Sequence, residues 1–247
     1  MLHSNYHEEF NVNIESGEKW WYAHVIELQG CFSRGSTRDE VLTTLPIEII
    51  AHLERLKTWG FECPSFRGFK IAEETYNIPS LGEAGGAVAL FESDHLIIDL
   101  NDLDLFIRLM TLNRNELLKI TEHLPVDVMR SSPIPGKWSI EETLSHVVNA
   151  EEWYVSRIGL KYQQFYEHEL EASTIDHSDV VVRLRVTRPC LVKVIELAFR
   201  DNHRSVFKRK EYTRYPEEPW TLRKVLRRFV EHEREHISTI KRTLEKL

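Results

Sequence analysis

The stretch that decides the fold of this chain is Trp220-Thr-Leu-Arg-Lys-Val-Leu-Arg-Arg-Phe-Val-Glu-His232-Glu-Arg-Glu-His236-Ile237. Apolar residues recur in it every three or four positions and continue to Leu244, which predicts one long amphipathic helix. At about 100° per residue, His232 and His236 lie one turn apart and fall within the apolar stripe. Two imidazoles at this spacing can bind one metal ion together. The pair alone is a weak signal, so a third ligand has to come from elsewhere in the chain.

Four basic residues of this stretch lie mostly off its apolar stripe. The simplest interpretation is a solvated helix face, because charged side chains on an amphipathic helix usually point to water. These residues are Arg223, Lys224, Arg227 and Arg228.

Charge is distributed unevenly along the 247 residues. Residues 1–100 contain 7 Lys/Arg and 16 Asp/Glu, net −9, whereas the remaining 147 contain 25 and 23, net +2. Because an acidic surface repels phosphate backbones, nucleic acid is not an expected partner.

The composition is that of a soluble globular protein, with 42% hydrophobic and 29% charged residues. No apolar run approaches the roughly 20 residues that span a bilayer, and the first ten residues do not resemble a secretory signal. The three cysteines, Cys31, Cys63 and Cys190, are far apart and form no C-x-x-C pair. We therefore predict a cytoplasmic protein with no membrane segment, in which Cys31 is a small buried hydrophobe.

Residues 1–76 predict a small α+β domain with the order β-β-β-α-β. Alternating apolar residues between turn signals indicate a half-buried first strand and three more strands. A capping box, Thr37-Arg-Asp-Glu40, opens a helix that runs to about Leu56. Pro46 lies inside this helix and is expected to kink or restart it. The predicted strands are 6–14, 20–28, 30–35 and 66–76.

The segment from Tyr22 to Leu42, which contains Leu28-Gln-Gly-Cys31 and Gly35-Ser-Thr37, resembles the HicB-like antitoxin domain. That family shows a strand ending in Leu-x-Gly-Cys, then Gly-x-Thr and a helix. The resemblance implies a unit that binds a protein partner or a second copy of the chain, so a homodimer is expected. Here Glu-Val-Leu replaces the usual Glu-Ala at the helix start, and no DNA-binding appendage follows.

Residues 77–101 are rich in glycine and proline, which predicts a linker. From residue 102 the apolar period becomes helical, and no strand signal interrupts it. Four amphipathic helices indicate an all-α four-helix bundle over 102–247. Pro189 is expected to interrupt or restart the third helix. The predicted helices are 102–124, 139–159, 176–200 and 220–244.

The second and fourth predicted helices begin alike, with Trp138-Ser139 and Trp220-Thr221. Each pair is a large aromatic residue followed by a hydroxyl residue that can cap a helix. His146 lies about two turns after the first cap, and His232 lies about three turns after the second. Each histidine is therefore on the same face as its own cap. Two helices of one bundle can in this way direct three imidazoles to a common point.

The segment Gly136-Lys-Trp-Ser-Ile-Glu-Glu-Thr-Leu-Ser-His146, with Trp220-Thr221 and His232-x3-His236, resembles the DinB/YfiT-like family. The resemblance covers roughly residues 102–247. It implies a four-helix bundle that binds a divalent metal ion through three histidines, here His146, His232 and His236. Known members are thiol-dependent S-transferases and isomerases, and many have no assigned activity. Three imidazoles leave a coordination position open and suit zinc, nickel or iron.

Two carboxylates, Glu151 and Glu233, fall within the apolar stripes of the second and fourth helices. A buried carboxylate needs a partner. Each could orient a ligand histidine, act as a general base, or form an ion pair with an arginine such as Arg114 or Arg157. The sequence leaves these roles open and identifies no catalytic residue. The remaining histidines are expected on the surface or in loops: His3, His7, His24, His52, His95, His123, His168, His177 and His203.

Two functions remain open from the sequence. The first is a metal-dependent hydrolase or thiol transferase that acts on a small-molecule or thiol substrate at the three histidines. The second is a non-enzymatic module, in which the HicB-like part binds a protein partner or a second copy and the bundle is a scaffold.

Overall fold

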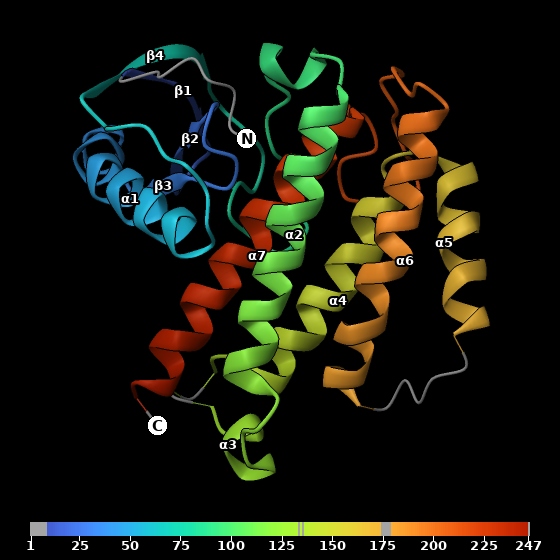
Figure 1. Ribbon diagram of the computed structural model, residues 1–247. Coiled ribbons are helices and arrows are strands. Elements are labelled where there is room, and N and C mark those ends of the chain that lie inside the picture. The colour runs from blue at the N-terminus through green and yellow to red at the C-terminus, as the bar shows by residue number, and fades with distance from the viewer. Residues whose placement is uncertain (1–8, 133, 135, 174–178, 247) are drawn as a thin grey trace.

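The computed structural model describes residues 9–132, 134, 136–173 and 179–246, and its elements are shown in Figure 1. The N-terminal elements are β1 (Glu9–Ser16), β2 (Trp21–Val25), β3 (Phe32–Gly35), α1 (Arg38–Thr58) and β4 (Gly68–Thr75). A short 3₁₀ helix, η1 (Glu92–His95), precedes the helical part. The remaining helices are α2 (Leu100–Thr121), α3 (Val126–Arg130), α4 (Ile140–Ser156), α5 (Leu160–Ala172), α6 (Val180–Arg200) and α7 (Leu222–Leu244).

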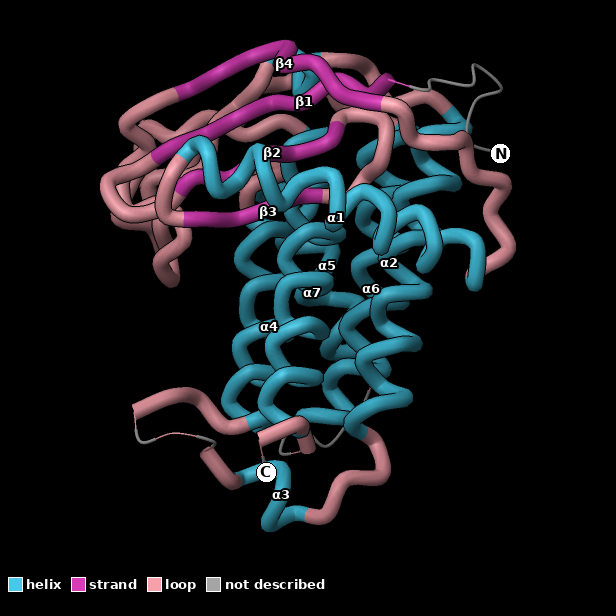
Figure 2. The backbone as a smooth tube through the Cα atoms, turned by 90° about the vertical axis from the view of Figure 1, so that its left-hand side faces the viewer, coloured by secondary structure: helices cyan, strands magenta, loops and turns pink. Residues whose placement is uncertain are grey.

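The four strands form one mixed sheet with the order β3-β2-β1-β4. β1 is antiparallel to β2 and parallel to β4, and α1 supplies the crossover between β3 and β4. The predicted order β-β-β-α-β is confirmed. Figure 2 shows the strands at one end of the molecule and α3 at the opposite end, with the long helices between them.

β1 is buried on both faces, so the prediction of a half-buried strand was wrong. Its apolar residues Phe10, Val12 and Ile14 belong to a core that also contains the buried face of α1. On the opposite parity, Asn13 and Glu15 are also buried. The Asn13 side-chain amide donates to Ser93 Oγ at 3.0 Å, and Glu15 Oε2 accepts from the backbone N–H of Ala89 at 2.6 Å. The segment before α2 therefore covers the polar face of the strand.

The helical part contains four long helices, α2, α4, α6 and α7, as predicted. It also contains α5, which the sequence analysis missed and which packs on α4 and α6 at the edge of the bundle (Figure 1). Pro46 and Pro189 lie inside α1 and α6, and both helices continue through them, so neither helix restarts at its proline. A kink at Pro46 stays a prediction. α6 begins at Val180, with Asp179 as its N-cap, and the earlier part of its predicted range lies outside the described residues.

α7 lies between the N-terminal elements and the other long helices (Figure 1). In the N-terminal half of α7, both the polar and the apolar face are covered. Lys224 is fully buried and donates to the carbonyl oxygens of Val88 and Pro219. Arg227 is also buried and forms an ion pair with Asp94 at 2.9 Å. The predicted solvated face was therefore wrong, because the segment 77–101 and the sheet cover it.

One hydrophobic cluster extends from the sheet and α1 into α2, α4, α6 and α7, and a second lies toward the α3 end of the bundle. Cys31 belongs to the first cluster as predicted, and burial raises the pKa of its thiol to about 12. Within the described ranges, no helix is both long and apolar enough to span a membrane. The division at residues 77–101 stays a prediction.

Candidate metal centre

The helices that carry the candidate ligands begin at the predicted caps. On α4, Ser139 Oγ accepts from the backbone N–H of Glu142 at 3.1 Å, and Glu142 accepts from the backbone N–H of Ser139 at 2.7 Å. On α7, Thr221 Oγ1 accepts from the backbone N–H of Lys224 at 3.1 Å. These bonds satisfy N–H groups that the first helical turn leaves free. They fix where each helix begins, and with it the direction of the histidines further along.

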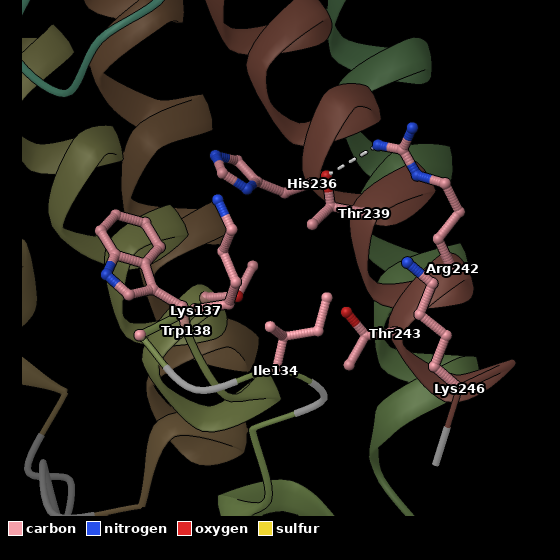
Figure 3. A pocket seen from close by; sticks show the side chains of 10 residues that line it. Ile134, Lys137, Trp138, His236, Thr239, Arg242, Thr243 and Lys246 are labelled. Atoms are coloured by element: carbon pink, nitrogen blue, oxygen red, sulfur yellow. Dashed lines mark hydrogen bonds between the residues drawn. The ribbon is translucent and has the colours of Figure 1, made fainter.

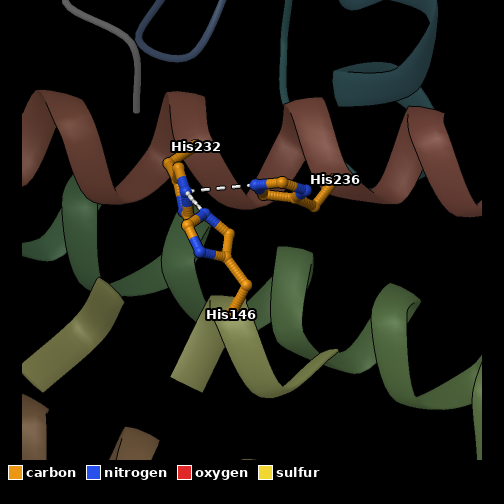
Figure 4. Close-up of side chains that lie close together, drawn as sticks. All are labelled: His146, His232 and His236. Atoms are coloured by element: carbon orange, nitrogen blue, oxygen red, sulfur yellow. Dashed lines mark hydrogen bonds between the residues drawn. The ribbon is translucent and has the colours of Figure 1, made fainter. Parts of the chain in front are cut away.

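His146 of α4 and His232 and His236 of α7 meet between the two helices (Figure 4). The Nε2 atom of His232 lies 3.0 Å from that of His146 and 3.1 Å from that of His236. The candidate ligand atoms all lie within 4.8 Å of one another. The structure thus brings together the three histidines that the sequence analysis identified. His146 and His232 are 86 positions apart in the sequence.

Burial favours the neutral form of all three imidazoles. Burial lowers the pKa of His146, and it lowers the pKa of His232 well below the usual value, with His236, His146 and Arg228 adding to the effect. Burial and His146 lower the pKa of His236 to about 3. A neutral imidazole keeps a lone pair for a metal ion, so protons compete weakly for these nitrogens.

The geometry of the three nitrogens fits a metal ion. In a tetrahedral zinc site with bonds of about 2.0–2.1 Å, ligand nitrogens lie about 3.3 Å apart. The observed Nε2 separations of 3.0 and 3.1 Å are close to this spacing. Two imidazole nitrogens whose lone pairs face each other repel. A proton shared by two of these nitrogens would still leave the third without a hydrogen-bond partner. A divalent cation at the common point would satisfy all three, so the cluster can hold one.

Glu151 and Glu233 lie in a buried charge network rather than at the imidazoles. Glu233 contacts Arg114 at 2.6 Å and Arg188 at 2.8 Å, and Glu151 contacts the same two arginines at 2.5 and 3.3 Å. The network joins α2, α4, α6 and α7. Of the alternatives left open above, the ion pair with Arg114 is the one that the structure contains. Arg157 instead donates to the carbonyl oxygens of residues 209, 211 and 212.

Aromatic rings surround the histidine cluster on two sides. Trp138 lies 4.9 Å from the His146 ring, between ring centroids, and Tyr154 lies 5.8 Å from His232. Trp220, the aromatic residue at the start of α7, is buried. Trp138, the corresponding residue before α4, is half exposed. The two similar helix starts therefore have different surroundings.

A cavity of about 530 Å³ adjoins the cluster at His236 (Figure 3). Its walls come from the segment before α4, the first turn of α4, the C-terminal half of α7 and the residues that follow it. The sequence analysis did not identify it, because its cations look like ordinary surface residues along the chain. Its lining residues are Ile134, Gly136, Lys137, Trp138, Thr143, His236, Thr239, Arg242, Thr243 and Lys246.

Two of the other histidines are buried, so their expected surface placement was wrong. His24 lies between Glu231 at 2.8 Å and Glu15 at 3.0 Å, and links β2 to α7. His52 of α1 is 2% exposed, and neither ring nitrogen has a hydrogen-bond partner within the described ranges. His95, His123 and His168 are exposed and His203 is partly buried in a loop, whereas His3, His7 and His177 lie outside the described residues.

These features define a mixed sheet packed on a helical bundle, with a three-histidine cluster that can hold a divalent metal ion. The chain belongs to the DinB superfamily, whose family model matches residues 109–240, more than half of its length. The predicted DinB resemblance is confirmed. Nothing in the comparisons identifies the N-terminal part as HicB-like, and that resemblance stays a prediction.

One solved structure resembles this chain at 17% sequence identity and a TM-score of 0.43. It is described as YfiT from Bacillus subtilis, a probable metal-dependent hydrolase with an unusual four-helix bundle topology. The match covers 64% of this chain and 92% of that one. No curated protein matches this chain significantly in sequence.

Proposed function

We propose that this protein is a metal-dependent enzyme that activates a nucleophile, either water for hydrolysis or a thiol for transfer. His146, His232 and His236 would hold a zinc, nickel or iron ion. The observation that carries the proposal is the convergence of three neutral imidazole nitrogens at 3.0 and 3.1 Å, beside a cavity that a small molecule can enter. Ligand cavities usually have volumes of about 300–1,000 Å³, and this one falls in that range.

Three protein ligands leave a coordination position open, as in catalytic rather than structural zinc sites. A divalent ion bound there would act as a Lewis acid and lower the pKa of a water or thiol. His236 belongs both to the cluster and to the wall of the cavity, so a molecule in the cavity would meet the open side of the site. The rings of Trp138 and Tyr154 pack beside the cluster.

We assign no protein carboxylate as the general base. The four carboxylate oxygens of Glu151 and Glu233 all contact guanidinium groups, and Arg114 and Arg188 outweigh burial to lower the pKa of Glu151. A carboxylate held in the charged form by two arginines is a weak proton acceptor. The role we give these two residues is to hold α2, α4, α6 and α7 in register.

The alternative function, a partner-binding N-terminal domain on an inert scaffold, has less support. The polar face of the sheet is already covered by α7, through His24 and Glu231, and by the segment around η1. The N-terminal part therefore uses this face of its sheet to pack on its own bundle.

Elemental analysis of protein purified without an affinity tag tests the proposal. We expect about one zinc, nickel or iron ion per chain, and loss of that ion in His232→Ala. His168→Ala removes an exposed imidazole from α5 and should leave the metal content unchanged. A screen of ester, amide and thiol-transfer substrates would then separate hydrolase from transferase. Metal-free wild-type protein that fails to bind added zinc would refute the proposal.

A further inference from the structure

Among the residues that the structure describes, the cavity beside the histidine cluster is lined by cations and by no acidic side chain. Lys137 comes from the segment before α4, and Arg242 and Lys246 come from the last turns of α7 and the residues after it. Figure 3 shows Lys137 and Trp138 on one side of the cavity and Arg242 and Lys246 on the other. Like charges that face the same space repel each other, and a cavity lined by one sign of charge concentrates the field in it.

The described part of the chain does not neutralise these cations. Over the described ranges, neither Lys137 nor Lys246 forms an ion pair, and Arg242 donates only to the hydroxyl of Thr239, at 3.3 Å. Elsewhere on α7 the pattern is different, since Arg223, Arg227 and Arg234 each pair with a carboxylate. The positive charge of the cavity is therefore available to a ligand.

The other lining groups complete a site for a small polar molecule. The hydroxyls of Thr143 and Thr239 already donate to the backbone carbonyl oxygens of Ser139 and Glu235, at 2.8 and 3.0 Å, so within the described ranges Thr243 supplies the lining hydroxyl that can donate to an anionic oxygen. Trp138 offers an apolar ring that rests on His146. A guanidinium can bind a carboxylate or a phosphate through two parallel hydrogen bonds, and an ammonium group binds either one as a point charge.

We propose that this cavity binds a small molecule that carries carboxylate or phosphate groups, with Lys137, Arg242 and Lys246 as its cationic contacts and its reacting part at His236. The position of the reacting group at His236 rests on the proposed function. The anion-binding site depends only on the residues that line the cavity. The proposal implies that the substrate is an anion.

Calorimetric titration with defined probes tests the proposal. Succinate and phenyl phosphate supply the two anionic groups, and succinamide is a neutral molecule of the same shape as succinate. We expect both anions to bind and succinamide not to bind, and the stronger anion identifies the group that the site prefers. The double variant Lys137→Gln/Arg242→Gln should weaken anion binding by at least about tenfold, the equivalent of one or two lost charge-assisted hydrogen bonds.

The matched control is Lys70→Gln, which removes the same charge from an exposed position on β4 and should bind succinate as the wild type does. Succinamide binding as tightly as succinate would overturn the proposal. So would unchanged binding in the double variant, or no binding of either anion.

Titration of both zinc-loaded and EDTA-treated protein separates this inference from the proposed function. Anion binding that persists without metal, in a protein that takes up no zinc, would refute the metal enzyme and leave the anion site standing. A protein that binds about one zinc ion but neither anion would keep the metal centre and lose the anion site.

Discussion

At the scale of single residues, the buried charges decide how this protein is held together. Arg114, Glu151, Arg188 and Glu233 form a closed set, in which each carboxylate meets two guanidiniums inside the bundle. Moving these ions out of water is costly, and their mutual attraction offsets that cost only while the set is complete. Removal of one member leaves an uncompensated charge.

We therefore expect Glu151→Gln to lower the free energy of unfolding by roughly 3–5 kcal/mol, measured by urea denaturation. Glu152→Gln changes the next, exposed residue of the same helix and should have little effect. Metal content should match the wild type in both variants, because these carboxylates contact arginines and not imidazoles. A loss of metal in a folded Glu151→Gln protein would instead support the orienting role that the sequence left open.

His24 provides a pH-dependent contribution to stability. Burial by itself lowers its pKa, but Glu231 and Glu15 outweigh burial and raise the pKa above its usual value. A raised folded-state pKa means that the stabilisation is fully present below about pH 6.5, the unfolded value, and is lost as the pH rises through the folded-state pKa.

The difference in unfolding free energy between the wild type and His24→Gln should accordingly be largest near pH 6 and shrink at alkaline pH. Urea denaturation over this range measures it, and comparison of the two proteins cancels the contributions of the other histidines. A difference that grows with pH would contradict the charged state of His24.

At the scale of elements, the sequence predicted regular periods well and long-range coverage poorly. The strands, the N-cap at Thr37, the capping box at Ser139 and the four long helices follow from local patterns. At Thr37 the predicted capping box is only half formed, because Glu40 accepts from the backbone N–H of Ser36 instead. The charged face of α7 was misread, because nothing in its own sequence shows that the sheet packs there. α5 was missed, since its buried residues are mainly the two tyrosines Tyr162 and Tyr166.

For the candidate site, the three histidines could be predicted because two helix starts and two helical spacings fix their faces. The cationic cavity could not, because its walls come from residues about 100 positions apart and each cation alone looks like a surface residue. The buried pair of Glu15 and Glu231 with His24 likewise joins distant segments. Tertiary placement, and not local propensity, decides these features.

The two prolines inside helices also show that tertiary packing can outweigh local propensity. α6 continues through Pro189 because its buried face, including Leu184, Leu191 and Val194, packs in the core on either side of the proline. The proline itself is exposed, and it cannot donate a helical hydrogen bond.

Pro189→Ala should therefore stabilise the protein by about 2 kcal/mol, since the restored helical bond outweighs the greater freedom of the unfolded chain. Urea midpoints measure this change. Pro216→Ala, in an exposed loop, should give no stabilisation. An equal gain at both positions would show that the effect does not come from the helix.

At the scale of the whole molecule, one core joins the sheet, α1 and five further helices, which are α2, α4, α5, α6 and α7. We expect both halves to unfold together. Fluorotryptophan NMR can follow Trp21 and Trp59 of the N-terminal part and Trp153 and Trp220 of the helical part in one urea series. Coincident midpoints are expected for a shared core. Earlier loss of one pair would show two separately stable units.

The position of α7 in the chain has a consequence for biosynthesis. Glu15 and His24 are made about 200 residues before Glu231, the residue that completes their ionic contact, and His146 waits for both of its neighbours on the same helix. During translation the nascent sheet exposes a polar face, and the nascent bundle lacks two imidazoles. Native contacts of such long sequence separation form late. When α7 emerges from the ribosome, it therefore covers the polar face of the sheet and completes the histidine cluster in the same step.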